Sequence, residues 1–353
     1  NNLNERVPSC PTFKWVPYSG MGLFCTERIN MAKPFKTIEQ QLDILRSRKL
    51  EIDDELAARN ALSSYGYYEI VNGYKSFLLN SLSEEEEFRE GETFSHLLSL
   101  YQLDKEIRNG VIESTLEVEL ALRTAIAYVI SERFGEEESR YLKKSNYMRG
   151  KKREGSTRYP LHQLFDKLNK ILNEDLEPYK HYREQHGNIP PWILLKGTTF
   201  GNLVNFYKLL KPTEKSKVIS ICYGLEERFV TESTKNMFTQ TLNLIHSYRN
   251  RAAHSGRMFS YKSDKSIVYN EIFHEQMGIT LKDYNAGRGQ TGLHTLLTAL
   301  SLFKNKRINF LLEFSIYYNS KKHCESYPQD LVLLCQETEI EEQLFKKNFL
   351  RYN

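Results

Sequence analysis

The sequence predicts an all-α protein. Apolar residues recur at intervals of three and four residues over most of the chain, which is the spacing of one face of a helix. Residues that favour helix starts and helix ends flank these stretches. Signals for β-strands are weak, and the best of them covers only residues 266–269. With 353 residues the chain is long enough to bury a full hydrophobic core.

Two helices are expected near the start of the chain. Thr37 and Gln40 have the spacing of a capping box, in which each side chain accepts a hydrogen bond from the other residue's backbone N–H. Asp53 or Asp54 is placed to cap a second helix, and Gly66 is placed to end it.

A long helix is expected over residues 95–134. Gly110 interrupts its pattern as a candidate break, and Gly135 is suited to end it. Two prolines at residues 190–191 end the element that precedes them. Further helices are expected over residues 201–210, 214–222, 231–255, 291–318 and 339–349.

The composition excludes several classes of protein. A net charge of only +4 means that a nucleic-acid surface would have to come from local patches. No apolar run is long enough to span a bilayer, and residues 1–30 lack the apolar core of a secretion signal, so they are interpreted as an extension. The five cysteines show no CxxC or Cys/His metal spacing. Reduced thiols, a cytoplasmic location and the absence of a metal or cofactor are therefore expected.

Residues 143–158 form a basic segment. They carry seven lysine or arginine side chains against one glutamate, and Tyr147 and Tyr159 are placed to stack on bases. The candidate RNA contacts are Lys151, Lys152 and Arg153. A flexible, solvated loop explains the same composition, and the sequence does not choose between the two interpretations.

The segment 248–257 reads Tyr-Arg-Asn-Arg-Ala-Ala-His-Ser-Gly-Arg and is the most informative in the chain. On a helical wheel Arg249 falls on a stripe that is otherwise apolar, made of Phe238, Leu242, Ile245 and Ala252. A buried guanidinium is costly unless it is paired, so Arg249 is expected to meet a carboxylate or to line a polar cavity. The opposite stripe is polar throughout and consists of Asn243, His246, Asn250 and His254.

The spacing of Arg249 and His254 is not that of helical neighbours. Five residues place them about 140° apart on a regular helix, whereas Asn250 and His254 share one face. Three arrangements would bring the arginine and the histidine to one phosphate. The arginine wraps around the helix, the helix loosens before Gly256, or a second copy of the helix supplies the missing partner. The third arrangement predicts a symmetric dimer with a composite site.

Arg249, Asn250 and His254 resemble the Arg-x4–6-His motif of HEPN ribonucleases, in which a polar residue usually follows the arginine. The same broad spacing occurs in residues 89–96 and 288–294. Neither of those copies has Asn, Asp or His after the arginine, and both lie in glycine-containing stretches, so they are discounted.

Other landmarks resemble, in order, the Abi family of phage-defence proteins of the AbiD/AbiF type. Residues 33–54 resemble the opening of that family, residues 65–74 its aromatic segment, residues 117–124 its long central helix and residues 190–203 its Pro/Phe-Gly segment. The ordered resemblance ends near residue 260. Neither the first thirty residues nor those after 263 carry a matching motif.

The resemblance implies an α-helical HEPN-type bundle with additional N- and C-terminal helices, and a homodimer that cleaves RNA without a metal. Its setting would be abortive infection or a toxin–antitoxin system, with a small noncoding RNA as the partner that restrains the toxin. In that case His254 is the general acid/base, Arg249 stabilises the transition state and Asn250 orients the reacting groups. The expected division is an extension over 1–30, a helical segment over 31–88, the core with its basic loop over 89–262 and a helical segment over 263–353.

Several residues near the motif have two interpretations. His246 is either a second proton carrier or a hydrogen-bonded structural histidine. Glu119 either forms an ion pair with Arg123 one helical turn away or supports the motif arginine. Arg251 and Arg257 flank the motif and suit phosphate contacts.

Two other functions compete with cleavage. The first is a non-catalytic RNA-binding or interaction protein that uses the polar stripe as a dimer interface. It predicts that charge reversal across residues 143–158 removes a strongly salt-dependent RNA binding. The second, weaker alternative is a nucleotidyl- or phosphotransferase toxin, and it lacks both a P-loop and a paired-carboxylate metal motif.

Overall fold

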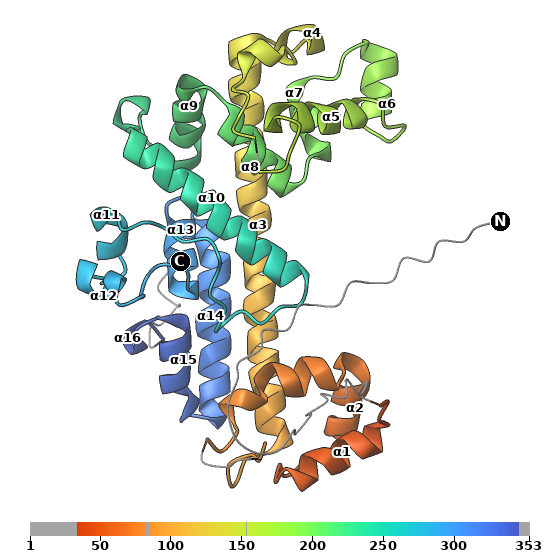
Figure 1. Cartoon of the computed structure of the whole chain (residues 1–353), viewed down its shortest axis with the longest axis vertical. Coiled ribbons are helices and arrows are strands. Elements are labelled where there is room, and N and C mark those ends of the chain that lie inside the picture. The colour runs from red at the N-terminus through yellow and green to blue at the C-terminus, as the bar shows by residue number, and fades with distance from the viewer. Residues whose placement is uncertain (1–33, 82–84, 153, 346–353) are drawn as a thin grey trace, which may run out of the picture.

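The computed structural model of the chain describes residues 34–81, 85–152 and 154–345. These residues form helices and loops without a β-strand, which confirms the predicted all-α class. The longest helix, α3 (Phe94–Phe134), runs through the molecule as an axis, and α10 (Glu232–Ala253) crosses it (Figure 1). None of the described helices is both long and apolar enough to cross a membrane.

The two N-terminal helices begin where the sequence predicts. The helix α1 (Ile38–Ser47) has the complete capping box of Thr37 and Gln40. The helix α2 (Glu55–Tyr65) is capped by Asp54, whose carboxylate accepts a hydrogen bond from the backbone N–H of Ala57 at 2.9 Å. Both helices lie beside the N-terminal end of α3 (Figure 1).

Gly110 does not break α3. The helix continues through it, and the sequence-based expectation of a candidate break is wrong. A Cβ atom at this position would lie 2.6 Å from the Cβ atom of Ser315 on α14 (Arg307–Ser326), which packs along α3. The hydroxyl of Ser315 also donates a hydrogen bond to the carbonyl oxygen of Glu106 at 2.5 Å. Glycine is needed here because two helix backbones approach closely.

The remaining helices are short. They are η1 (Tyr68–Asn72), η2 (Lys75–Phe77), α4 (Glu138–Tyr141), η3 (Lys144–Asn146), α5 (Pro160–Leu172), α6 (Tyr179–His181), η4 (Tyr182–His186), α7 (Pro191–Leu194), η5 (Leu195–Gly197), α8 (Phe200–Leu209), α9 (Pro212–Tyr223), η6 (Glu227–Phe229), α11 (Glu271–Glu275), α12 (Leu281–Asn285), α13 (Leu293–Ser301), α15 (Asp330–Thr338) and α16 (Glu342–Phe345).

Two predicted helices differ from the structure. The expected helix over 291–318 is divided into α13 and α14, because the chain turns between them where the backbone N–H of Lys304 donates to the carbonyl of Cys222 at 2.8 Å. The expected helix over 339–349 is reduced to α16 in the described residues. Glu339 adopts a left-handed conformation with φ of 62° and ends α15, and residues 346–349 lie outside the described part.

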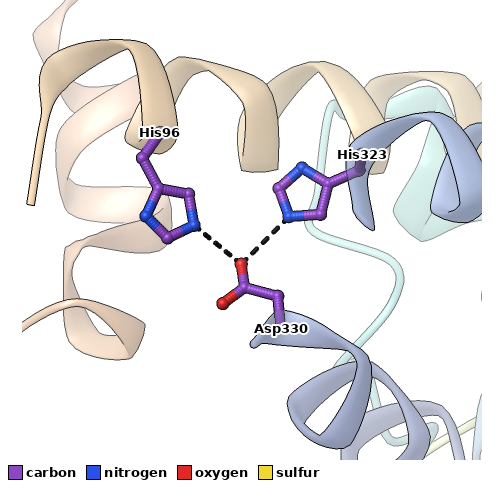
Figure 2. A group of neighbouring side chains, drawn as sticks. All are labelled: His96, His323 and Asp330. Atoms are coloured by element: carbon purple, nitrogen blue, oxygen red, sulfur yellow. Dashed lines mark hydrogen bonds and ion pairs between the residues drawn. The ribbon is translucent and has the colours of Figure 1, made fainter. Parts of the chain in front are cut away.

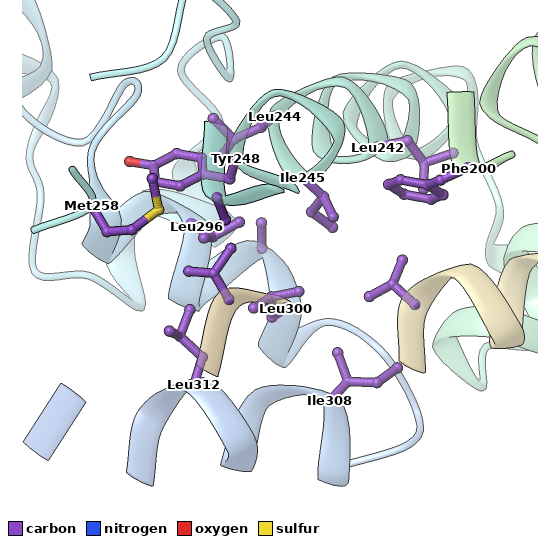
Figure 3. Packing of buried hydrophobic residues seen from close by; sticks show 14 of the residues in the cluster. Phe200, Leu242, Leu244, Ile245, Tyr248, Met258, Leu296, Leu300, Ile308 and Leu312 are labelled. Carbon is purple, nitrogen blue, oxygen red and sulfur yellow. The ribbon is translucent and has the colours of Figure 1, made fainter. Parts of the chain in front are cut away.

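One hydrophobic core joins the motif helix to the C-terminal segment. Figure 3 shows apolar side chains of α8, α10, α13 and α14 packed together, with Met258 from the segment that follows α10. The labelled residues of this core are Phe200, Leu242, Leu244, Ile245, Tyr248, Met258, Leu296, Leu300, Ile308 and Leu312. The position of α10 therefore depends on the helices that come after it in the chain as well as on α3.

Candidate functional site

The motif helix α10 has well-defined ends. Thr231 caps its start by accepting a hydrogen bond from the backbone N–H of Thr234. At its end, the N–H of Gly256 donates to the carbonyl of Arg251 at 2.9 Å and the N–H of Ser255 donates to that of Ala252 at 3.1 Å, which is a Schellman arrangement. Ser255, with φ of 57°, takes the left-handed position of this arrangement, which glycine more often occupies. His254 is the last residue before the turn.

Two buried side chains of α3 hold the turn in place. The guanidinium of Arg108 donates to the carbonyl of Ser255 at 2.7 Å. The fully buried carboxylate of Asp104 accepts hydrogen bonds from the backbone N–H groups of Met258 and Phe259, both at 2.8 Å. The hydroxyl of Tyr74 donates to the same carboxylate at 2.8 Å. The end of α10 is therefore fixed relative to the long axis of the molecule.

The polar stripe of α10 faces an open pocket of about 490 Å³. All four side chains that the sequence analysis assigns to this stripe line the pocket, and they are Asn243, His246, Asn250 and His254. The other lining residues are Ser247, Arg251, Tyr261, Asp264 and Lys265. The pocket thus combines hydrogen-bonding groups, two cations and a single carboxylate, which already pairs with Lys265 at 2.6 Å.

His246 and Asn250 are bonded to each other within the pocket. The amide Nδ2 of Asn250 donates to Nε2 of His246 at 3.2 Å, so this ring nitrogen carries no proton. Partial burial, with the charges of Arg249 and Lys208, lowers the pKa of His246. Gly201 on α8 lies against the ring, since a Cβ there would be 2.9 Å from Nε2. His246 is a neutral, hydrogen-bonded histidine that orients the Asn250 amide.

His254 and Arg251 occupy the exposed rim of the pocket. The ring of His254 is exposed and makes no hydrogen bond with the described residues. The Arg251 guanidinium lies over the ring of Tyr261, 5.3 Å from its centroid. Any side chain at position 256 would overlap the Arg251 side chain, so Gly256 is required for this placement. The imidazole of His254 is therefore available to a ligand that enters the pocket.

Arg249 lies apart from His254. It is half-buried at the edge of the apolar stripe, does not line the pocket, and has no hydrogen-bond or ion-pair partner within the described ranges. Among the described residues, Arg249 has no carboxylate partner, and it does not line the pocket at α10, so the expected pairing is not found there. Its charge is still close enough to lower the pKa of His246. The structure of one chain therefore brings Asn250 and His254 together and leaves Arg249 beside them.

Two other predicted residues have partners of their own. Arg257 donates to the carbonyl of Gly73 at 2.5 Å and lies over the Phe77 ring, 4.8 Å from its centroid, so it attaches the turn to the N-terminal segment. Glu119 accepts a hydrogen bond from Arg123 at 2.5 Å, as expected for an ion pair one helical turn apart.

The basic loop contributes to a second pocket of about 330 Å³, which lies beside the first. Lys151 lines it together with Lys167 and Lys208. The ammonium of Lys208 donates to Oδ1 of Asn243, at 2.6 Å, and Asn243 lines the first pocket. Lys208 thus connects the two pockets. Lys208 is not among the residues predicted from the sequence, because no pattern along the chain relates it to a partner on another helix.

The aromatic residues of the basic loop differ from each other. Tyr147 is buried, and its hydroxyl donates to the carbonyl of Tyr141 at 2.6 Å, so the expectation that it stacks on bases is wrong. Tyr159 is half-buried, and the ammonium of Lys152 lies 4.8 Å from its ring centroid. Arg153 lies outside the described residues.

Comparison with known proteins gives one match. A family model described as Abi-like protein matches residues 60–260, which is more than half of the chain. The matched range includes α3, the whole of α10 and all lining residues of the second pocket, whereas Tyr261, Asp264 and Lys265 of the first pocket lie just beyond it. No curated protein and no solved structure matches the chain. The protein therefore belongs to the Abi-like family, and this membership points to abortive infection as its biological setting.

Proposed function

We propose that the protein is a metal-independent endoribonuclease of the HEPN type that acts in phage abortive infection. Its catalytic residues are Arg249, Asn250 and His254, and its substrate is RNA. The observation that carries the proposal is the exposed, unengaged imidazole of His254, which shares a polar pocket with the oriented amide of Asn250.

The chemistry requires one proton carrier and fixed positive charge. The neutral imidazole of His254 removes the proton of a ribose 2′-hydroxyl, whose oxygen attacks the adjacent phosphorus. The imidazolium then donates that proton to the departing 5′-oxygen. The products are a 2′,3′-cyclic phosphate and a 5′-hydroxyl end. A guanidinium stabilises the charge that develops on the phosphate oxygens.

Arg249 completes the site from a second chain. In one chain it lies about 140° around α10 from His254, does not line the pocket, and has no partner of its own in the described structure. A symmetric dimer that pairs the ends of two α10 helices would place the arginine of each chain near the histidine of the other. This arrangement supplies both groups without any distortion of the helix.

The RNA strand approaches along the line of the two pockets. The second pocket is lined by Lys151, Lys167 and Lys208, and the first pocket is lined by Arg251 and Lys265. The hydrogen bond between Lys208 and Asn243 joins these two groups of cations. Such a row of cations neutralises successive phosphates and leads the strand to His254. A small noncoding RNA that follows the same line would restrain the enzyme by occupying it.

Mixed dimers test the composite site. Arg249→Ala and His254→Ala chains are each expected to lose cleavage of a labelled single-stranded RNA and to lose growth inhibition in a bacterial host. When the two variants are co-expressed, each mixed dimer regains one intact site. Random pairing then restores about a quarter of the wild-type sites. The measurement is the rate at which 5′-hydroxyl ends appear.

The control uses one chain that carries both substitutions. Co-expressed with wild type, it gives mixed dimers in which each of the two sites lacks one group, so it should not add activity. If co-expression of the single variants restores nothing, the site lies within one chain. If His254→Ala retains full cleavage, the catalytic assignment is wrong, and RNA binding without cleavage becomes the function.

A further inference from the structure

A second polar cluster lies far from α10 in the sequence and is almost completely buried. His96 comes from the first turn of α3, His323 from the last turn of α14, and Asp330 from the start of α15 (Figure 2). Their exposed fractions are only 2 %, 3 % and 3 %. Oδ2 of Asp330 lies 2.8 Å from Nε2 of His96 and 2.9 Å from Nε2 of His323. Three different helices thus direct one atom each toward a common point.

The outer nitrogen of each imidazole is held by another partner. Nδ1 of His96 lies 2.6 Å from Oε2 of Glu92, and Nδ1 of His323 lies 2.8 Å from the hydroxyl of Ser99. The ring of Tyr327 stacks on His96 with a centroid separation of 3.9 Å. Both rings are therefore fixed in orientation, with each Nε2 turned inward.

We infer that His96, His323 and Asp330 bind a divalent transition-metal ion, for which Zn²⁺ is the best fit. Two imidazole nitrogens and one carboxylate oxygen form a donor set that zinc commonly takes in proteins. Metal-bound histidines nearly always donate their other N–H to a carboxylate or another acceptor, and Glu92 and Ser99 are placed to accept it. The inference is independent of the proposed ribonuclease activity.

The distances permit an ion after a modest rearrangement of the three ligands. All three donor atoms lie within 4.8 Å of one another. A tetrahedral ion about 2.0–2.1 Å from each ligand atom holds neighbouring atoms roughly 3.3 Å apart. Each Nε2 would then move a few tenths of an ångström away from Oδ2, from the present 2.8 and 2.9 Å. The two Nε2 atoms, which lie within 4.8 Å of each other, would have to come to a similar separation by rotation of the rings.

An open pocket gives access to the cluster. It has a volume of about 530 Å³, and its walls include His323 and Ser99. It offers an entry for the ion and a source of water for a fourth coordination position. The bound ion would join the ends of α3 and α14 to the start of α15, so its role is structural.

The same groups can also form a charged network without a metal. Burial disfavours charge on His96, but its hydrogen bonds to Asp330 and Glu92 outweigh this and raise its pKa to about 9. Burial likewise disfavours the Asp330 carboxylate, but hydrogen bonds from His323 and His96 lower its pKa to about 2. In that state a proton, and not a metal ion, holds the three side chains together. This metal-free state is the outcome that would overturn the metal assignment.

Metal content of the full-length protein is the first test. The protein is purified without chelator, its affinity tag is removed, and its zinc is measured by elemental analysis. One equivalent of zinc per chain is expected, with a midpoint of thermal unfolding that falls in EDTA and recovers when Zn²⁺ is added. Replacement by Co²⁺ should give the visible absorption of a tetrahedral site. If the protein holds no zinc, and Zn²⁺ leaves its unfolding unchanged, the inference is wrong.

Variants locate the ion. His323→Gln and Asp330→Asn keep hydrogen-bonding capacity, and each should abolish zinc retention. Ser99→Ala removes only the support of a ligand, so it should weaken zinc affinity by about 10–100-fold in competition with a chromophoric chelator. The matched control is His274→Gln, because His274 is equally buried but bonds only to backbone atoms.

The outcomes of the variants separate the alternatives. Zinc retained in His274→Gln and lost in both ligand variants supports the site. Zinc retained in all variants places the ion elsewhere and overturns the assignment. If a ligand variant fails to fold, the zinc content and the Co²⁺ spectrum of the wild-type protein still decide the question.

Discussion

The two histidine clusters differ in how far their hydrogen-bonding capacity is used. At the end of α10, the exposed ring of His254 has no partner in the described structure, and Asn250 donates one hydrogen bond to His246. In the buried cluster, both nitrogens of His96 and both of His323 are engaged. Unused capacity on the surface is available to a substrate, whereas buried partners that converge on one point, together with the ion that we infer there, hold helices together.

The largest expected effect comes from paired substitutions in the two clusters. His254→Ala should lower RNA cleavage by about 10²–10⁴-fold, because a general acid/base contributes that much, with no change in thermal unfolding. His323→Gln should lower the stability of the fold and leave RNA cleavage unchanged. It should cost about 3–5 kcal/mol in the free energy of unfolding, because it removes one ligand of the inferred zinc ion and takes one partner from the buried charge of Asp330. Cleavage should be preserved at temperatures where the variant is folded.

Circular dichroism and the cleavage assay, run on the same preparations, check this pair. The comparison fails if His254→Ala lowers the unfolding midpoint as much as His323→Gln does. His254 would then be a structural residue, and its exposure would have no catalytic meaning.

The sequence predicts some of these features because they are local. The caps Thr37, Asp54 and Thr231 and the extent of α3 depend on residues a few positions apart. The polar stripe of α10 can also be predicted from the sequence, since the helical period alone defines which residues share a face. The role of Gly110 depends on α14, and no pattern along the sequence reports which helix lies opposite.

The cluster of His96, His323 and Asp330 also could not be predicted from local sequence patterns. His96 and Asp330 are 234 residues apart, so no motif spacing connects them. One signal was present, because His96 falls on the same helical stripe as the buried residues Leu100, Leu103 and Ile107. A histidine on an apolar stripe needs buried polar partners, which points to acidic residues on the apolar faces of other helices.

A large effect on stability is expected where α3 supports the turn after α10. Asp104→Ala removes the acceptor for the N–H groups of Met258 and Phe259 and for the Tyr74 hydroxyl. Buried donors without an acceptor cost about 1–3 kcal/mol each, so the variant should lose about 3 kcal/mol or more in urea unfolding. Tyr74→Phe removes only one of the three donors and serves as the smaller, matched change. Equal losses in the two variants would show that the turn does not depend on Asp104.

A smaller effect of opposite sign is expected at Ser255. This residue holds a left-handed conformation, with φ of 57°, that glycine adopts without strain. Ser255→Gly should therefore stabilise the protein by roughly 0.5–1 kcal/mol, after the entropic cost of glycine is subtracted. Ser255→Val should destabilise it, because a β-branched residue is disfavoured there. Cleavage by the glycine variant should be unchanged, since the carbonyl that Arg108 holds remains.

The last prediction concerns His246, whose ring accepts a hydrogen bond from Asn250 in the pocket. Partial burial and the charges of Arg249 and Lys208 lower its pKa. A histidine whose pKa is lower in the folded state stabilises the fold fully above the unfolded value near 6.5. That contribution is lost as the pH falls below this value. Arg249→Ala removes one of the two charges, so it should raise the pKa of His246 and reduce the loss of stability in acid.

An NMR titration of the His246 ring measures the change directly. Arg251→Ala is the matched control, because its guanidinium lies over Tyr261 and is not among the charges that lower the pKa of His246. If both arginine variants shift the titration equally, the whole pocket sets the charge state of His246, and Arg249 is not specifically close. If only Arg249→Ala does so, the motif arginine lies beside the hydrogen-bonded pair that orients Asn250. A partner chain would then have to supply the arginine that reaches His254.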